Sequence, residues 1–278
     1  MAKAIRLLTV IDIFFILLLA LSGTLCGPLG DVIYILAFAV PVFLGALGAA
    51  GLKEEREGVA GVREPVRIRL GLSSEGVSML LPLVAPTVAI VFLLALVTSL
   101  ALGALGAENN TVEVLPLWQM LIVNALLPAI LEELAFRYVP LKLLLPYSPR
   151  AAVIISALYF AFIHCNLYQM PYAFAAGVIF AVIDIMCDSI LPSVILHFLN
   201  NASSVLWIKY VTGVAEGAIY LSVLAVLVAV SLVFILRRKE KYARGIRAAF
   251  VGTELTFGYY PVMLAILSVG VAVTNLFI

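Results

Sequence analysis

The chain has 278 residues, of which 64% are hydrophobic and only 12% are charged, and its mean hydropathy is +1.19. In soluble globular domains about a quarter of all residues are charged, so this composition excludes that class. The net charge of +1 gives no basic excess for binding nucleic acid. The composition therefore predicts an all-α, polytopic membrane protein.

About nine apolar segments are long enough to form membrane-spanning helices, because a bilayer core needs about 20 residues of helix. They are residues 7–26, 32–52, 77–104, 116–138, 151–168, 171–187, 190–208, 217–236 and 257–278. A count of eight spans is the alternative. We also expect the connection 237–256 to lie partly in the membrane interface.

Basic residues are distributed unevenly between the two sides of this predicted bundle. If the N-terminus starts in the cytoplasm, all but one of the 17 Lys and Arg residues precede the first span or lie beside the connections after the second, fourth and eighth spans. Lys209 alone falls on the other side. Cytoplasmic loops carry an excess of Lys and Arg. We therefore expect a multi-pass protein of the cell membrane with a cytoplasmic N-terminus and an outward-facing C-terminus.

Few ionisable residues lie inside the predicted spans, where each costs about 2.5–3.5 kcal/mol on insertion scales and usually faces a protein interior or a water-filled cavity. Three amide residues also lie inside the predicted spans. Together, the ionisable and amide residues in the spans are Asp12, Glu132, Glu133, Arg137, His164, Asn166, Asp184, His197, Asn200 and Asn201. Both histidines of the chain belong to this set. The functional site is therefore to be sought among these residues.

Two adjacent glutamates stand near the end of the fourth predicted span. Glu133 and Arg137 are four residues apart, so they share a helix face in the favourable order for an ion pair. Glu132 points in a different direction and is left without that partner, which suits a general base. The alternative is that these charges only mark the cytoplasmic end of the span and reach toward water.

The fourth and fifth spans are joined by a turn around Ser148. Glu132 and His164 both lie 16 residues from this serine, so an antiparallel hairpin places them at the same depth and predicts a contact between them. Phe160 precedes His164 by four residues and shares its face, where it either covers the imidazole or simply packs against a neighbouring helix.

In the seventh span, His197 and Asn201 are four residues apart and direct two hydrogen-bond donors into the same space. Two convergent donors can stabilise an oxyanion, although His and Asn also join membrane helices by hydrogen bonds. A carboxylate, two imidazoles and an amide without a linked nucleophile favour hydrolysis by activated water. Cys165 is the competing nucleophile, but adjacent helix residues such as His164 and Cys165 diverge by about 100°.

The three motifs follow one another in order on three predicted spans, as Glu132-Glu133-x-x-x-Arg137, Phe160-x-x-x-His164 and His197-x-x-x-Asn201. In this arrangement the chain resembles the CAAX protease and bacteriocin-processing (CPBP, also called ABI) family of intramembrane glutamate endopeptidases. The resemblance covers residues 118–208. We expect these residues to form the catalytic core of a single membrane domain over 1–278, with 1–105 and 217–278 as peripheral spans.

The resemblance implies that Glu132 and His164 activate water and that His197 and Asn201 form the oxyanion site. Glu133, Arg137 and Phe160 are then supporting residues. The substrate is expected to be a prenylated, CAAX-type or other membrane-associated peptide, cleaved near its C-terminus in a cavity open to the cytoplasm. Membrane lipid is the other expected partner, and neither a cofactor nor a metal ion is expected. A zinc site made by the two glutamates and two histidines is the alternative.

Two functions of other classes stay open. In an ion-coupled secondary transporter, Asp12, Glu132 and Asp184 would bind ions at broken helices, although no internal repeat is evident. A non-catalytic membrane scaffold or immunity factor would keep the fold and bind a partner. Asp184 and Asp188 are interpreted as a solvated helix end, with substrate binding as the alternative.

Overall fold

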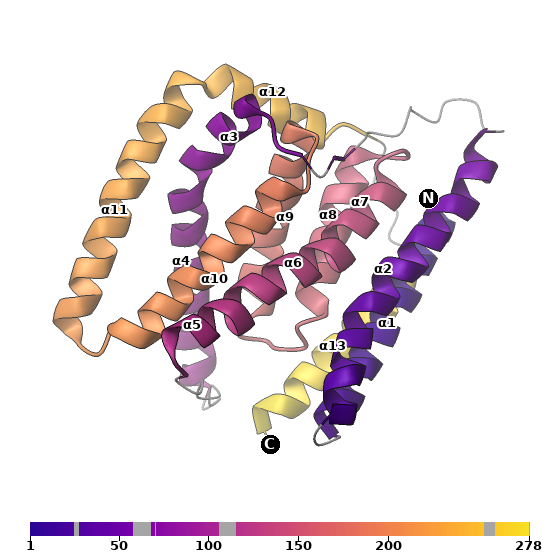
Figure 1. The fold of residues 1–278 in the computed structure, drawn as a ribbon, viewed down its shortest axis with the longest axis horizontal. Coiled ribbons are helices and arrows are strands. Elements are labelled where there is room, and N and C mark those ends of the chain that lie inside the picture. The colour runs from indigo at the N-terminus through magenta and orange to yellow at the C-terminus, as the bar shows by residue number, and fades with distance from the viewer. Residues whose placement is uncertain (25–27, 58–67, 70, 106–114, 253–258, 278) are drawn as a thin grey trace.

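The computed structural model describes residues 1–24, 28–57, 68–69, 71–105, 115–252 and 259–277, and these residues are almost entirely helical. Figure 1 shows the helices. The α-helices are α1 (Ala2–Thr24), α2 (Pro28–Glu57), α3 (Ser74–Leu80), α4 (Val84–Ala104), α5 (Leu117–Met120), α6 (Leu127–Glu133), α7 (Val139–Leu144), α8 (Pro149–Phe162), α9 (Met170–Cys187), α10 (Leu191–Tyr210), α11 (Val214–Arg237), α12 (Lys239–Ala249) and α13 (Tyr259–Phe277). A 3₁₀ turn, η1 (Leu81–Leu83), joins α3 to α4. Two π-helical segments, η2 (Leu121–Leu126) and η3 (Leu134–Tyr138), flank α6.

The predicted polytopic helical bundle is confirmed. Within the described residues, seven helical segments are long and apolar enough to cross a membrane. They are Ala2–Ser22, Val32–Gly51, Ser74–Ala104, Leu117–Leu144, Met170–Cys187, Leu191–Tyr210 and Val214–Arg237. Two shorter apolar helices occupy the remaining predicted segments, Pro149–Phe162 and Tyr259–Thr274. Each of the nine segments expected from the sequence therefore coincides with an apolar helix.

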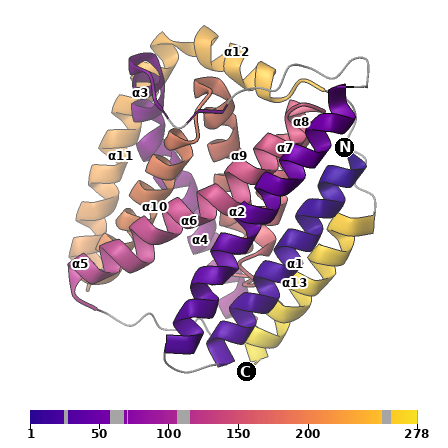
Figure 2. The same cartoon turned by 45° about the vertical axis from the view of Figure 1, so that its right-hand side comes forward.

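The helices form two groups that are visible in both ribbon views. Helices α1, α2 and α13 lie side by side and cover the side of the bundle that contains α7 and α8 (Figures 1 and 2). The N-terminus lies toward the end of the bundle that α12 crosses, and the C-terminus lies at the opposite end. Termini at opposite ends are what an odd number of crossings produces.

The connection after α11 forms a helix of its own. α12 runs across the end of the bundle at a steep angle to α11 (Figure 1). Three of its contacts fasten it to the start of the α3–α4 segment: Tyr242 Oη donates to the Met79 carbonyl over 2.7 Å, Arg238 binds Ser78, and Lys241 pairs with Glu75. A charged helix that lies across a bundle of apolar helices is typical of the membrane interface.

The π-helical segments of the α5–α7 stretch have a local cause. Each ends two residues before a proline, η2 at Leu126 before Pro128 and η3 at Tyr138 before Pro140. A proline has no N–H and its ring collides with the carbonyl four residues earlier, so the chain widens into a π turn before it. The amides of Leu127 and Val139 accordingly donate to the carbonyls of Ile122 and Leu134, five residues back. The helix continues through both prolines and carries the Glu132-Glu133 pair between the two widened turns.

Candidate active site

The ion pair predicted on one helix face is present and lies in the interior. Arg137 Nε is 3.2 Å from Glu133 Oε2, and both side chains are fully buried. Arg137 Nη1 also donates to Ser156 Oγ on α8 over 3.1 Å, and the guanidinium lies 5.0 Å from the centre of the Phe160 ring. These charges do not reach toward water, so the interpretation that they only mark a helix end is wrong for Glu133 and Arg137.

Glu132 has the separate environment that its position on the helix predicts. Its side chain keeps 18% exposure and lines a cavity, and it takes no part in the pair with Arg137. Its Oε2 lies 3.9 Å from Nε2 of His197 on α10. A partly solvated carboxylate beside an imidazole is available for proton transfer.

His197 contacts both glutamates. Its Nδ1 lies 3.0 Å from Glu133 Oε1, while its Nε2 faces Glu132. The ring is enclosed by Phe160 and Phe180, whose centroids lie 5.6 and 5.7 Å away. Glu133 therefore accepts from Arg137 with one oxygen and holds His197 with the other. Reasoning from helix spacing assigned only the first of these contacts, because the second depends on how α6 packs against α10.

His164 lies just beyond the end of α8, in the connection to α9. Its Nδ1 lies 2.7 Å from the Phe160 carbonyl, and the Phe160 and imidazole rings meet edge to face with centroids 5.1 Å apart. A carbonyl only accepts hydrogen bonds, so Nδ1 carries the proton and the lone pair of Nε2 is available to the cavity. The predicted direct contact between Glu132 and His164 is not among the hydrogen bonds of the described residues. Both side chains instead line the same cavity.

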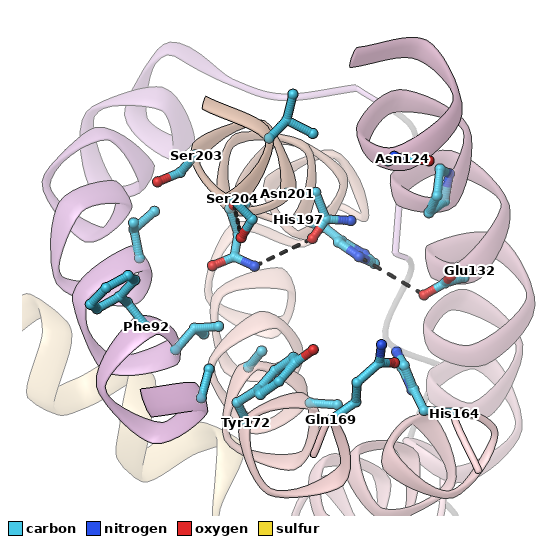
Figure 3. Close-up of a pocket in the computed structure, with 18 of the residues that line it drawn as sticks. Phe92, Asn124, Glu132, His164, Gln169, Tyr172, His197, Asn201, Ser203 and Ser204 are labelled. Carbon is cyan, nitrogen blue, oxygen red and sulfur yellow. Dashed lines mark hydrogen bonds and ion pairs between the residues drawn. The ribbon is translucent and has the colours of Figure 1, made fainter. Parts of the chain in front are cut away.

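Asn201 follows His197 by one helix turn and also lines the cavity. Its Oδ1 accepts a 3.3 Å hydrogen bond from Asn200 Nδ2. With its oxygen engaged in this way, the Asn201 amide keeps its N–H donors for the cavity. Figure 3 shows Glu132, His197 and Asn201 directed into one space, with His164 beside Gln169 at its lower edge. Asn200, one of the three amides in the predicted spans, orients the Asn201 amide.

The cavity has a volume of about 480 Å³ and lies between α4, α6, α9 and α10. Sequence reasoning missed much of its lining. One face of α4 supplies an apolar wall at helical spacing, made by Val88, Val91, Phe92 and Ala95, and polar groups outside the three motifs are Asn124, Gln169, Tyr172, Ser203, Ser204 and Tyr220. The α4 face gave no signal because α4 is apolar on every side. Of these missed residues, Asn124 could have been found from the sequence, because it is an amide inside the apolar segment 116–138.

The expected absence of a metal ion rests on the family resemblance. Among the residues that the structure describes, no group of three or more His, Cys, Asp or Glu side chains is arranged to hold a metal ion. Within this part of the chain, Glu132, Glu133 and His197 are joined instead by the hydrogen bond and close contact described above.

Comparison with known proteins places the motif-bearing segment in a family. Residues 113–203 match the family described as Rce1-like, type II CAAX prenyl endopeptidase Rce1-like. The matched segment includes α5 to α9 and the part of α10 that carries His197 and Asn201. No curated protein and no solved structure gives a significant match. The resemblance to CAAX proteases is thereby confirmed.

Proposed function

We propose that this chain is an intramembrane glutamate endopeptidase, because residues 113–203 match the Rce1-like family of type II CAAX prenyl endopeptidases. The substrate is a prenylated CAAX-type peptide or another membrane-associated peptide, hydrolysed near its C-terminus. The observation that carries the proposal is the convergence of Glu132, His164, His197 and Asn201 on one cavity inside an apolar bundle.

In the proposed reaction, Glu132 takes a proton from a water molecule that also donates a hydrogen bond to Nε2 of His164. The hydroxide attacks the scissile carbonyl carbon and produces a tetrahedral oxyanion. Glu132 then delivers the proton to the leaving nitrogen as the C–N bond breaks, so that one water is consumed for each peptide bond. Neither step needs a covalent intermediate.

His197 and Asn201 are the proposed oxyanion donors. Glu133 accepts from Nδ1 of His197, so a protonated imidazole donates from Nε2 toward the cavity while Glu133 offsets its charge. The Asn201 amide adds a second donor, since its oxygen is occupied by Asn200. Donors fixed before the reaction stabilise the charge that develops in the transition state.

The apolar wall of α4 supports a substrate with an apolar portion. Val88, Val91, Phe92 and Ala95 face the catalytic groups across the cavity, which places an apolar side chain or lipid on one side and the scissile bond on the other. The basic residues at the end of the bundle crossed by α12 support a cytoplasmic assignment for that end.

The test uses purified protein in detergent with a fluorogenic prenylated CAAX peptide, in the presence and absence of a chelator. Wild type is expected to cleave under both conditions, whereas Glu132→Ala and Glu132→Gln are expected to lose at least about a thousandfold in kcat. Glu216→Gln, which removes an exposed carboxylate in the first turn of α11, is the matched control and should retain full activity.

Three results would contradict the proposal. Equal cleavage by wild type and Glu132→Ala would remove Glu132 from the mechanism. Loss of activity on chelation, with restoration by a metal ion, would show that the enzyme depends on metal. If wild type cleaves neither the prenylated peptide nor its unprenylated counterpart, this result would count against a CAAX-type substrate.

A further inference from the structure

Asp184 lies at the end of α9 and has no role in the proposed reaction. Its interpretation as part of a solvated helix end is wrong, because its side chain is fully buried. Asp188, four residues later, is exposed and has the left-handed backbone conformation that ends α9. A buried carboxylate in an apolar bundle is costly unless its oxygens are used, so its partners are informative.

One of these partners is the first turn of α10. The opening N–H groups of a helix have no acceptor within it, and the residue before α10, Ile190, has no side-chain oxygen to supply one. The donors are satisfied individually. Leu191 N–H donates to Ser189 Oγ over 3.1 Å, Pro192 has no N–H, and Ser193 N–H donates to Asp184 Oδ1 over 2.9 Å. Asp184 thus caps α10 from the preceding helix through the acceptor oxygen Oδ1.

The same residue fastens the turn between the two helices. The backbone carbonyl of Asp184 accepts the N–H of Ser189 over 3.1 Å and the N–H of Asp188. The backbone carbonyl of Asp184 therefore accepts the hydrogen bonds that close the end of α9, while its side chain caps the first turn of α10. The three-residue turn between the helices is therefore held by Asp184 from within, and by two backbone hydrogen bonds that join Arg69 to Asp188 and Ile190.

This cap is one helix turn from the active site. Ser193 and His197 are four residues apart and share a face of α10, and His197 is held by Glu133. A shift of the first turn of α10 would therefore move the imidazole relative to both glutamates.

We propose that Asp184 is a positioning residue that holds His197 in place by capping the helix on which His197 lies. The role in catalysis rests on the proposed function, but the effect on the position of His197 does not. The acceptor oxygen, rather than the charge, is the required feature, so Asn should replace Asp184 and Ala should not.

The first experiment does not depend on activity. The chain contains two histidines, so carbethoxylation by diethyl pyrocarbonate can be followed by mass spectrometry at His197 with His164 as internal reference. Loss of a helix cap is expected to raise the ratio of the His197 rate to the His164 rate about fivefold in Asp184→Ala. Asp184→Asn should stay within about twofold of wild type, as should Asp188→Asn, the matched substitution at the exposed aspartate.

The second experiment uses the cleavage assay. Asp184→Ala is expected to lower kcat about tenfold with KM within about twofold, and Asp184→Asn to restore kcat to within about threefold of wild type. A smaller fraction of folded enzyme would lower kcat equally at every pH, whereas a misplaced His197 changes the shape of the pH profile. We expect a changed profile for Asp184→Ala and the wild-type profile for Asp188→Asn.

The outcomes separate this inference from the proposed function. An unchanged histidine ratio in Asp184→Ala, or equal ratios in Asp184→Ala and Asp184→Asn, would overturn the positioning role even if wild type cleaves peptides. A raised ratio that Asn reverses would support it even if wild type cleaves nothing. Should Asp184→Ala fail to fold, Asp184→Ser takes its place, since its hydroxyl is too short to reach the Ser193 N–H.

Discussion

Nδ1 of His197 lies 3.0 Å from Oε1 of Glu133, across the contact between α10 and α6. Glu133 also binds Arg137 on its own helix, so one buried carboxylate joins the structural ion pair to the imidazole that faces the cavity. The first and third motifs are therefore physically coupled. Glu132 and His197 are placed relative to each other through their neighbour Glu133.

Substitution of Glu133 is expected to reduce stability strongly. Glu133→Gln keeps an amide oxygen for His197 but leaves the buried guanidinium of Arg137 without its counter-charge, which costs about 3–5 kcal/mol. We expect the apparent Tm in detergent to fall by about 10 °C. The double variant Glu133→Gln/Arg137→Gln should recover part of the loss, because it also removes the unpaired charge. A single variant as stable as wild type would disprove the importance of the pair.

Loss of the Asn201 amide is expected to affect the transition state rather than substrate binding. Asn201→Ala should lower kcat by about 10²–10³ with little change in KM, which is the usual effect of removing one oxyanion donor. Asn200→Ala should have a smaller effect, about tenfold, because it only releases the orientation of the Asn201 amide. Steady-state kinetics on the prenylated peptide measure both. A rise in KM alone for Asn201→Ala would indicate a substrate-binding role instead.

Gly177 on α9 allows a close approach to α8. A Cβ added there would lie 3.0 Å from the Ala157 Cα and 3.3 Å from Arg137 Nη2. Gly177→Ala is therefore expected to destabilise the protein by about 1–3 kcal/mol and to lower the apparent Tm by several degrees. Gly103→Ala on α4 is the control, since nothing lies within 4 Å of the added atom and alanine favours a helix. Equal Tm values for the two variants would contradict the packing argument.

The orientation inferred from the basic residues can be measured by cysteine labelling of intact cells. After Cys26, Cys165 and Cys187 are replaced by Ala, single cysteines are introduced at two exposed positions, Ala248 on α12 and Thr212 between α10 and α11. A membrane-impermeant maleimide is expected to label Thr212→Cys directly and Ala248→Cys only after permeabilisation. The reverse pattern would place the α12 end of the bundle outside the cell.

The identity and register of the main elements could be predicted from the sequence because they depend on local features. Apolar length defines each span, and a spacing of four residues determines which side chains share a helix face. The Glu133–Arg137 pair, the edge-to-face contact of Phe160 with His164 and the common direction of His197 and Asn201 follow from that spacing. The π turns before Pro128 and Pro140 did not disturb the ion pair.

Contacts between helices could not be predicted in the same way. In a soluble protein an apolar stripe shows which face of a helix is buried, but spans such as α4 are apolar on every side and carry no such signal. Only the packing of α6 against α10 brings Glu133 to His197, in place of the Glu132–His164 contact that a simple hairpin predicted. Packing likewise buries Asp184 beneath the first turn of α10. The sequence by itself thus determined the helices and the chemical groups that each one carries. The tertiary structure decided which of these groups meet, because lipid and protein interior are equally apolar surroundings for a helix face.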